Sequence, residues 1–80
     1  MINRTARSAF DGHIETASSM ALEHELGFEH ELGWAAGLVS YALFAGDITH
    51  EESALMHQRI RAVRSRRIAL LCRSSRREVA

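Results

Sequence analysis

The feature that most constrains the fold is a helix stop followed at once by a helix start, near the middle of the chain. Gly46 suits the left-handed position that commonly ends a helix. Thr49 and Glu52, three residues apart, match the capping box that begins one, and Glu51 and Glu52 favour the positive end of its dipole. Two helices joined by a turn of two to four residues form an antiparallel hairpin. The sequence therefore predicts a helical hairpin around this turn.

The rest of the chain extends this prediction to an all-α fold of two or three helices. The sequence contains no proline, and no segment shows the alternating β-branched pattern of a strand. Apolar residues recur at helical spacing over residues 5–16, 19–45 and 50–73, with residues 74–80 as a frayed tail. The first segment is either a separate helix or continuous with the second, because Gly12 weakens it by about 1 kcal/mol relative to alanine.

The chain is too small to bury a large core by itself. A chain of 80 residues buries only about 60% of its unfolded surface, and a single Cys72 forms no internal disulfide. The middle helix is apolar nearly all round from Trp34 onward, so it needs partners on more than one side. We therefore expect one small domain that completes its core as a homodimeric helical bundle. The last helix carries a seam with one arginine in it: Met56, Ile60, Val63, Arg67 and Leu70.

Charge is divided unequally along the chain. Residues 1–57 hold nine acids and two arginines, a net charge of −7, and residues 58–80 hold eight arginines and one acid, a net charge of +7. Pairing between these halves, within one chain or between subunits, would offset much of the positive field. The predicted hairpin aligns Glu29 and Glu31 with residues 63–65, and Glu23 and Glu25 with residues 69–71. We expect Arg73, Arg76 and Arg77 to remain free.

The predicted interaction surface combines apolar anchors with arginines. The small residues Gly33, Ala36, Gly37 and Ser40 share one side of a helix, where a second helix can approach closely. That second helix is either the arginine helix of the same chain or the equivalent helix of a dimer partner. Aromatic anchors dominate many interfaces, and arginines suit an acidic partner. The predicted protein-interface residues are Trp34, Gly37, Leu38, Tyr41, Arg66, Arg73, Arg76 and Arg77.

The sequence carries no signature of an enzyme, a cofactor site or a metal site. Helical metal clips need ligands three or four residues apart, but Phe28 and Trp34 stand four residues after His24 and His30. The six-residue repeat that holds these histidines turns its two copies about 120° apart on a helix, so they share no face. We therefore predict no catalytic residue, no cofactor and no metal ligand.

The chain also carries no signature of export or of a membrane span. The longest apolar stretch, from Leu32 to Ala45, has 14 residues, fewer than the roughly 20 that cross a bilayer. The first twenty residues have no apolar core typical of a signal peptide. Together with the single cysteine, these features predict a protein of the cytoplasm.

Two short segments and the arginine helix are the features in which the chain is similar to a known class of proteins. The segments are Gly33-Trp34-Ala35-Ala36-Gly37-Leu38 and Gly46-Asp47-Ile48-Thr49-His50-Glu51-Glu52, and with that helix they cover about half of the chain. In these features the chain resembles small helical proteins encoded by bacteriophages and mobile elements, such as quorum-sensing anti-activators, pilus-ATPase inhibitors and anti-CRISPRs. The resemblance implies stoichiometric binding to a bacterial protein target, with modulation or inhibition of that target. The alternatives are nucleic-acid binding through the arginine helix and a purely structural assembly subunit.

Overall fold

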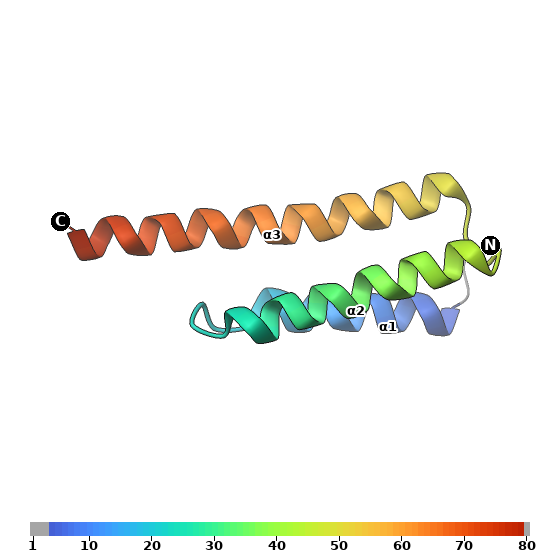
Figure 1. Cartoon of the computed structure of the whole chain (residues 1–80), viewed down its shortest axis with the longest axis horizontal. Coiled ribbons are helices and arrows are strands. Elements are labelled where there is room, and N and C mark those ends of the chain that lie inside the picture. Colours follow the sequence, from blue (N-terminus) through green and yellow to red (C-terminus); the bar gives the residue numbers. More distant parts are fainter. Residues whose placement is uncertain (1–3, 80) are drawn as a thin grey trace.

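The computed structural model describes residues 4–79, with side chains for residues 4–74, and it is all-helical as predicted. Three helices follow one another: α1 (Arg4–Ser19), α2 (Glu25–Phe44) and α3 (His50–Val79). No strand occurs among the described residues. α1 and α2 lie side by side, and α3 runs along this pair and continues past it (Figure 1). The molecule is therefore elongated, measuring 51 × 19 × 15 Å.

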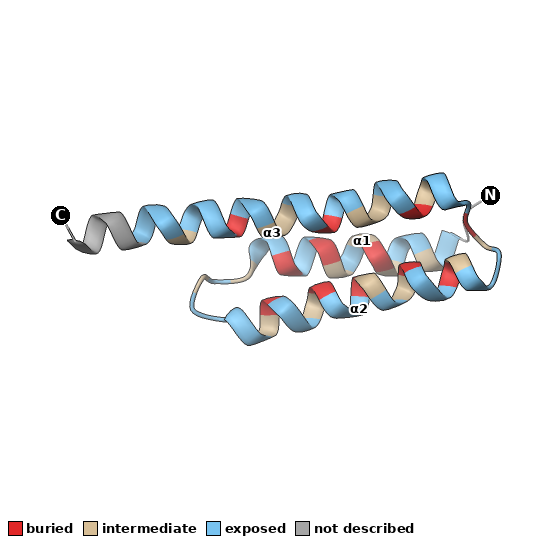
Figure 2. Ribbon diagram, turned by 45° about the horizontal axis from the view of Figure 1, so that its top comes forward, coloured by how far each residue is buried: buried red, intermediate tan, exposed pale blue. Residues whose placement is uncertain are grey.

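The core lies between the inner sides of the three helices, as the buried positions in Figure 2 show. Each helix contributes apolar residues three or four positions apart, the spacing that places side chains on one face. α1 and α2 supply most of the core, and α3 and the turn before it supply one residue each. The buried residues are Phe10, Ile14, Ala17, Phe28, Leu32, Ala35, Val39, Ala42, Ile48 and Ile60.

The predicted helix over residues 19–45 is wrong at its beginning. α1 ends at Ser19, the chain reverses over residues 20–24, and α2 begins at Glu25. The hydroxyl of Ser18 donates to the carbonyl of Ile14 at 2.8 Å, and the hydroxyl of Ser19 donates to that of Glu15 at 3.0 Å. Such bonds compete with continuation of the helix. The reversal lets α1 bury its apolar side against α2, so the first segment is a separate helix.

The turn between α2 and α3 has the backbone that its sequence predicts. Gly46 has φ +78°, and its N–H donates to the carbonyl of Leu43, while the N–H of Asp47 donates to that of Ala42. These two bonds form the Schellman motif that ends α2. The hydroxyl of Thr49 accepts from the N–H of Glu52 at 3.1 Å, and the Glu52 carboxylate accepts from the N–H of Thr49 at 2.9 Å. The predicted capping box therefore begins α3.

α3 is longer than predicted, because its helix continues to Val79 instead of ending at residue 73 with a frayed tail over residues 74–80. No glycine or proline follows Gly46, and arginine, alanine and leucine are good helix formers, so nothing in the sequence ends the helix earlier. Thirty residues extend for about 45 Å, against about 30 Å for the twenty residues of α2. The last turns of α3 therefore project beyond the other helices.

Two details of the predicted seam follow from this length. Arg67 lies level with the α1–α2 loop, because its guanidinium donates to the carbonyls of Met20 and Ala21. Leu70, one turn further, is therefore 41% exposed and lies outside the core to which the seam assigned it.

Within the described residues, no helix is both long enough and apolar enough to cross a membrane.

Candidate protein-interaction surfaces

α2 is apolar on two opposite sides, and only one of them is buried. Along the other side, eight exposed positions recur at helical spacing, and none of them carries a charged side chain. The four large apolar residues among them are 55–93% exposed. A long uncharged face of this kind is typical of an interaction site. We call it the α2 outer face, and it consists of Leu26, His30, Gly33, Trp34, Gly37, Ser40, Tyr41 and Phe44.

Trp34 is held in place although its side chain is more than half exposed. Its indole ring stacks on the imidazole of His13 in α1, with ring centroids 5.9 Å apart and planes 8° apart. The indole N–H donates to Nε2 of His30 at 2.8 Å. His13 is fixed in turn, because its Nδ1 lies 2.5 Å from a carboxylate oxygen of Glu31. A side chain already fixed loses less conformational entropy when a partner covers it.

An open groove of about 500 Å³ runs along this face, and its walls are the large side chains of Trp34, Leu38 and Tyr41. Gly33 and Gly37 form its floor, and a Cβ added at either glycine would meet no other group within 4 Å. The structure therefore brings together the four predicted apolar interface residues, Trp34, Gly37, Leu38 and Tyr41. Of the two alternatives for the helix that packs on the small residues, the arginine helix of the same chain is excluded at Gly33 and Gly37, because both glycines are exposed.

The six-residue repeat directs its two copies to different sides of α2, as its period predicts. Phe28, which ends the first copy, is buried with 2% of its surface exposed. Trp34, which ends the second, lies on the α2 outer face and is 55% exposed. The same short sequence thus supplies one core residue and one surface residue.

Two arginines of α3 join it to the other helices through ion pairs. Arg59 bonds Asp11 of α1, and its guanidinium lies over the ring of Phe10. Arg64 donates two hydrogen bonds to Glu29 of α2, at 3.2 and 2.9 Å. The predicted alignment of Glu29 with residues 63–65 is confirmed. These pairs offset part of the positive charge that a nucleic acid would meet.

The other predicted alignments differ because α1 occupies part of the space around α2. The carboxylate of Glu31 bonds His13 of α1, so it does not face residues 63–65 as expected. Glu25 lies near Ile68 and Leu71, where these three residues line a small pocket together with neighbouring arginines. Glu25 is therefore placed beside the part of α3 with which the sequence aligned it.

Arg67 is the least expected member of the arginine helix, because it is 6% exposed. Besides its two hydrogen bonds to the loop carbonyls, its guanidinium lies 4.2 Å from the ring centroid of Phe28. The arginine inside the apolar seam was the sequence signal for this burial. Arg67 thus ties the α1–α2 loop to α3.

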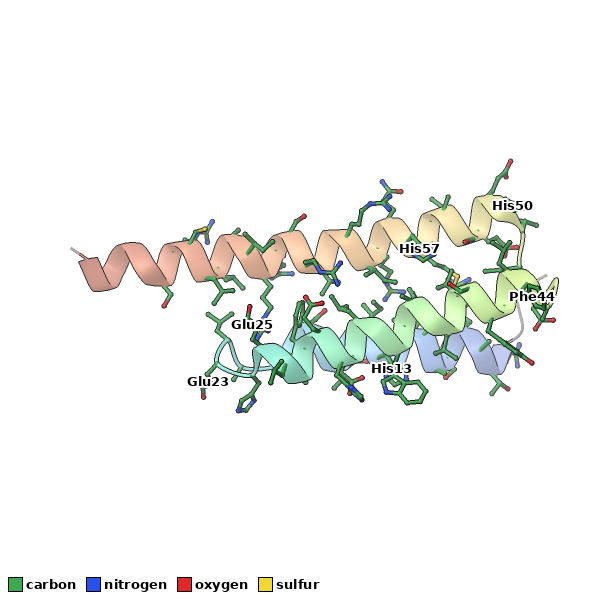
Figure 3. All side chains as sticks on the ribbon, viewed as in Figure 1. His13, Glu23, Glu25, Phe44, His50 and His57 are labelled. Carbon is green, nitrogen blue, oxygen red and sulfur yellow. The ribbon has the colours of Figure 1, made fainter. Side chains whose placement is uncertain are left out.

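The predicted interface arginines lie apart from the apolar ones. Arg66 is exposed and lines a notch of about 300 Å³ between α1 and α3, together with Ala17 and Leu70. Arg73 is exposed on the last described turns of α3. His13, which stacks on Trp34, lies on the side of α1 and α2 away from α3 (Figure 3). The predicted interface residues therefore form two separate surfaces, one apolar on α2 and one basic on α3. The side chains of Arg76 and Arg77, which were also predicted, lie outside the described residues.

The Glu29–Arg64 pair should make the fold acid-sensitive. Hydrogen bonds from Arg64 hold the pKa of the Glu29 carboxyl below its ordinary value of 4.5. Because the pKa is lower in the folded chain than in the unfolded chain, the pair stabilises the fold above pH 4.5. That stabilisation is lost as the pH falls through the lowered pKa.

Urea denaturation at a series of pH values measures this effect. We expect the free energy of unfolding to decrease less below pH 4.5 in Glu29→Gln than in the unmodified chain. Glu15→Gln, which changes an exposed carboxylate of α1, is the control and should keep the original profile. Identical profiles for the unmodified chain and Glu29→Gln would contradict the prediction.

The described residues contain no group of three histidine, cysteine or acidic side chains close enough to hold a metal ion. His50 and His57 lie along α3, whereas His13 lies on α1 (Figure 3).

In comparisons with protein-family models, curated proteins and solved structures, no match to this chain was found. The resemblance to small phage-encoded helical proteins stays a prediction.

Proposed function

We propose that the chain is a homodimeric, non-catalytic protein-interaction module of the cytoplasm, which binds a bacterial protein target in stoichiometric amounts and modulates or inhibits it. Two surfaces support the proposal. The α2 outer face offers apolar anchors, and the exposed arginines of α3, Arg66 and Arg73, offer forked donors for carboxylates. A second copy and the target are the two partners.

The single observation that carries this proposal is the state of Trp34. A tryptophan that served only the fold would be expected to bury its ring. This one is fixed by His13 and His30 and still leaves 55% of its surface exposed. Fixed aromatic side chains on an uncharged face are the usual anchors of protein interfaces. The glycine floor beside it leaves room for a helix of the partner.

Purification of the tagged chain from a bacterial host lysate, followed by reconstitution with the purified partner, tests the proposal. We expect one protein to bind in a fixed molar ratio, measured by isothermal titration calorimetry. The double variant Trp34→Ala/Tyr41→Ala should lose a contact of the module, either with that protein or with a second copy. Leu55→Ala is the control, because Leu55 is 65% exposed on α3, outside the α2 outer face. A double variant that keeps both contacts at full strength would contradict the proposal.

Nucleic-acid binding is a second candidate, and the observation that favours it is the exposure of Arg61, Arg66 and Arg73 along α3. Titration of duplex DNA at two salt concentrations separates it from the first candidate. Affinity that falls steeply with salt, and falls again in Arg66→Ala/Arg73→Ala, would favour this function over protein binding. We expect weak binding, because Arg59 and Arg64 are already paired with acids.

A further inference from the structure

Six of the eight residues of the α2 outer face are arranged symmetrically about residue 35. Among these six, small residues lie nearest to this point, polar residues lie next, and large apolar residues lie at both ends, whereas Trp34 and Tyr41 have no counterpart on the face. A face with this order fits a copy of itself turned end to end, as a two-fold axis requires. The equidistant pairs are Gly33 with Gly37, His30 with Ser40, and Leu26 with Phe44.

We infer that the α2 outer face is covered by α2 of a second copy, running antiparallel about a two-fold axis at residue 35. The inference rests on the proposed function, in which this face is a contact surface, and it names the partner. Gly33 of each copy then lies opposite Gly37 of the other, where the helices cross. Leu26 of each copy meets Phe44 of the other at both ends of the contact.

The two glycines support a helix as the occupant. Each glycine costs a helix about 1 kcal/mol relative to alanine. Packing within one copy does not explain them, because an added Cβ at Gly33 or Gly37 would meet nothing within 4 Å. A second backbone that approaches closely does explain them, since glycines permit such an approach. A shallow crossing of about 20° keeps the ends of both helices in contact as well.

The exposed area of the face is enough for a small dimer interface. Trp34, Tyr41 and Phe44 are 55%, 71% and 93% exposed, and Leu26 is 89% exposed. With about 200 Å² for each aromatic side chain, the three aromatics alone expose roughly 450 Å² per copy. Adding Leu26 in both copies brings the total above about 1,000 Å², the lower limit for a specific interface. No charged side chain on the face has to be desolvated in this contact.

Charge favours the antiparallel orientation. α3 runs past the N-terminal end of α2 (Figure 1), and the part of it that follows Arg67, residues 68–79, holds three arginines and one acid. A parallel pair would place two such basic ends together, where they would repel each other. In the antiparallel pair they lie at opposite ends of the dimer. Each then shares its end with Asp47 and Glu51 of the other copy, and the dipoles of the two α2 helices oppose each other.

A substitution on the glycine floor tests the contact without disturbing the fold of one copy. We expect sedimentation equilibrium of the full chain at micromolar concentrations to show a dimer. Gly37→Leu should raise the dissociation constant of the dimer roughly 30-fold or more, because a side chain at the crossing separates the two backbones. Gly12→Leu is the matched control, since Gly12 is also an exposed helical glycine with nothing near an added Cβ. It should leave the dimer unchanged, and circular dichroism should show all three proteins folded.

Disulfide cross-linking tests the orientation. In a Cys72→Ser background, Leu26→Cys and Phe44→Cys place single thiols at the two ends of the face, both at exposed positions. Mixing the two variants, tagged to differ in mass, should give mainly the mixed cross-linked dimer. Each variant alone should cross-link poorly, because its two thiols then lie about 27 Å apart along the helices.

The outcomes separate the inference from the proposed function. Preferential cross-linking of each variant to itself would show a parallel dimer and overturn the inference. A monomeric chain that still binds a target, and loses it in Trp34→Ala/Tyr41→Ala, would also overturn it, while the target binding of the proposed function would stand without its homodimer. A dimer unaffected by Gly37→Leu would place the dimer contact elsewhere and likewise contradict it.

Discussion

Replacing Arg67 by alanine is expected to lower the free energy of unfolding by about 2–4 kcal/mol, a large part of the stability of so small a chain. The substitution removes two charge-assisted hydrogen bonds to the carbonyls of Met20 and Ala21. It also removes the cation–π contact with Phe28 and leaves a cavity beside that ring. The α1–α2 loop loses its tie to α3, so we expect urea denaturation to show a lower midpoint.

Two further variants separate the contributions of the Arg67 side chain. Arg67→Met keeps most of the apolar volume but makes no hydrogen bond to the loop, and we expect it to lie between Arg67→Ala and the unmodified chain. Arg66→Ala is the control, because Arg66 is exposed, and it should stay within about 0.5 kcal/mol. If Arg67→Met matched the unmodified chain, the buried charge would contribute no net stability, as happens for some buried ion pairs.

The second large effect is expected for Leu32→Ala, which should lower the free energy of unfolding by about 2–5 kcal/mol. Leu32 is 1% exposed and is one of the largest fully buried side chains of the core. Its loss removes apolar contacts and leaves a cavity in a core of few large side chains. Thermal denaturation followed by circular dichroism measures the change.

Leu55→Ala is the matched control for this prediction. Leu55 is also a helical leucine, but it is 65% exposed, so its removal should cost no more than about 0.5 kcal/mol. An equal loss of stability in the two variants would show that the chain does not use the core described above. In a dimer, both measurements depend on protein concentration and should be compared at the same concentration.

The helix end and the helix start around Gly46 can be predicted from the sequence. Gly46 and the Thr49–Glu52 pair predict where one helix ends and the next begins, because each acts through its own backbone and its near neighbours. Helical spacing likewise predicts the buried side of α3 from Met56 to Arg67. The loop over residues 20–24 was missed because its signal, the pair Ser18 and Ser19 at the end of α1, is weak without a nearby glycine or proline.

The candidate interaction residues were predicted as a set but not as an arrangement. Trp34, Gly37 and Tyr41 were predicted as interface residues of one helix but not as one side of it, and the structure shows them around one groove. The role of His13 could not be predicted, because it depends on α1 folding back beside α2. The separation of Arg66 and Arg73 from the apolar residues depends on the side of α2 that α3 covers.

The sequence by itself determined the all-α fold, the α2–α3 turn and the nearly all-round apolar character of α2 from Trp34 onward, because these depend on spacing and on contacts within a few residues. Only the tertiary structure decided which side of α2 is buried. α1 and α3 cover the side that bears Phe28 and Leu32, since that side offers the continuous row of apolar side chains that fills their grooves. The other side, with Trp34 and its glycines, is left for a partner.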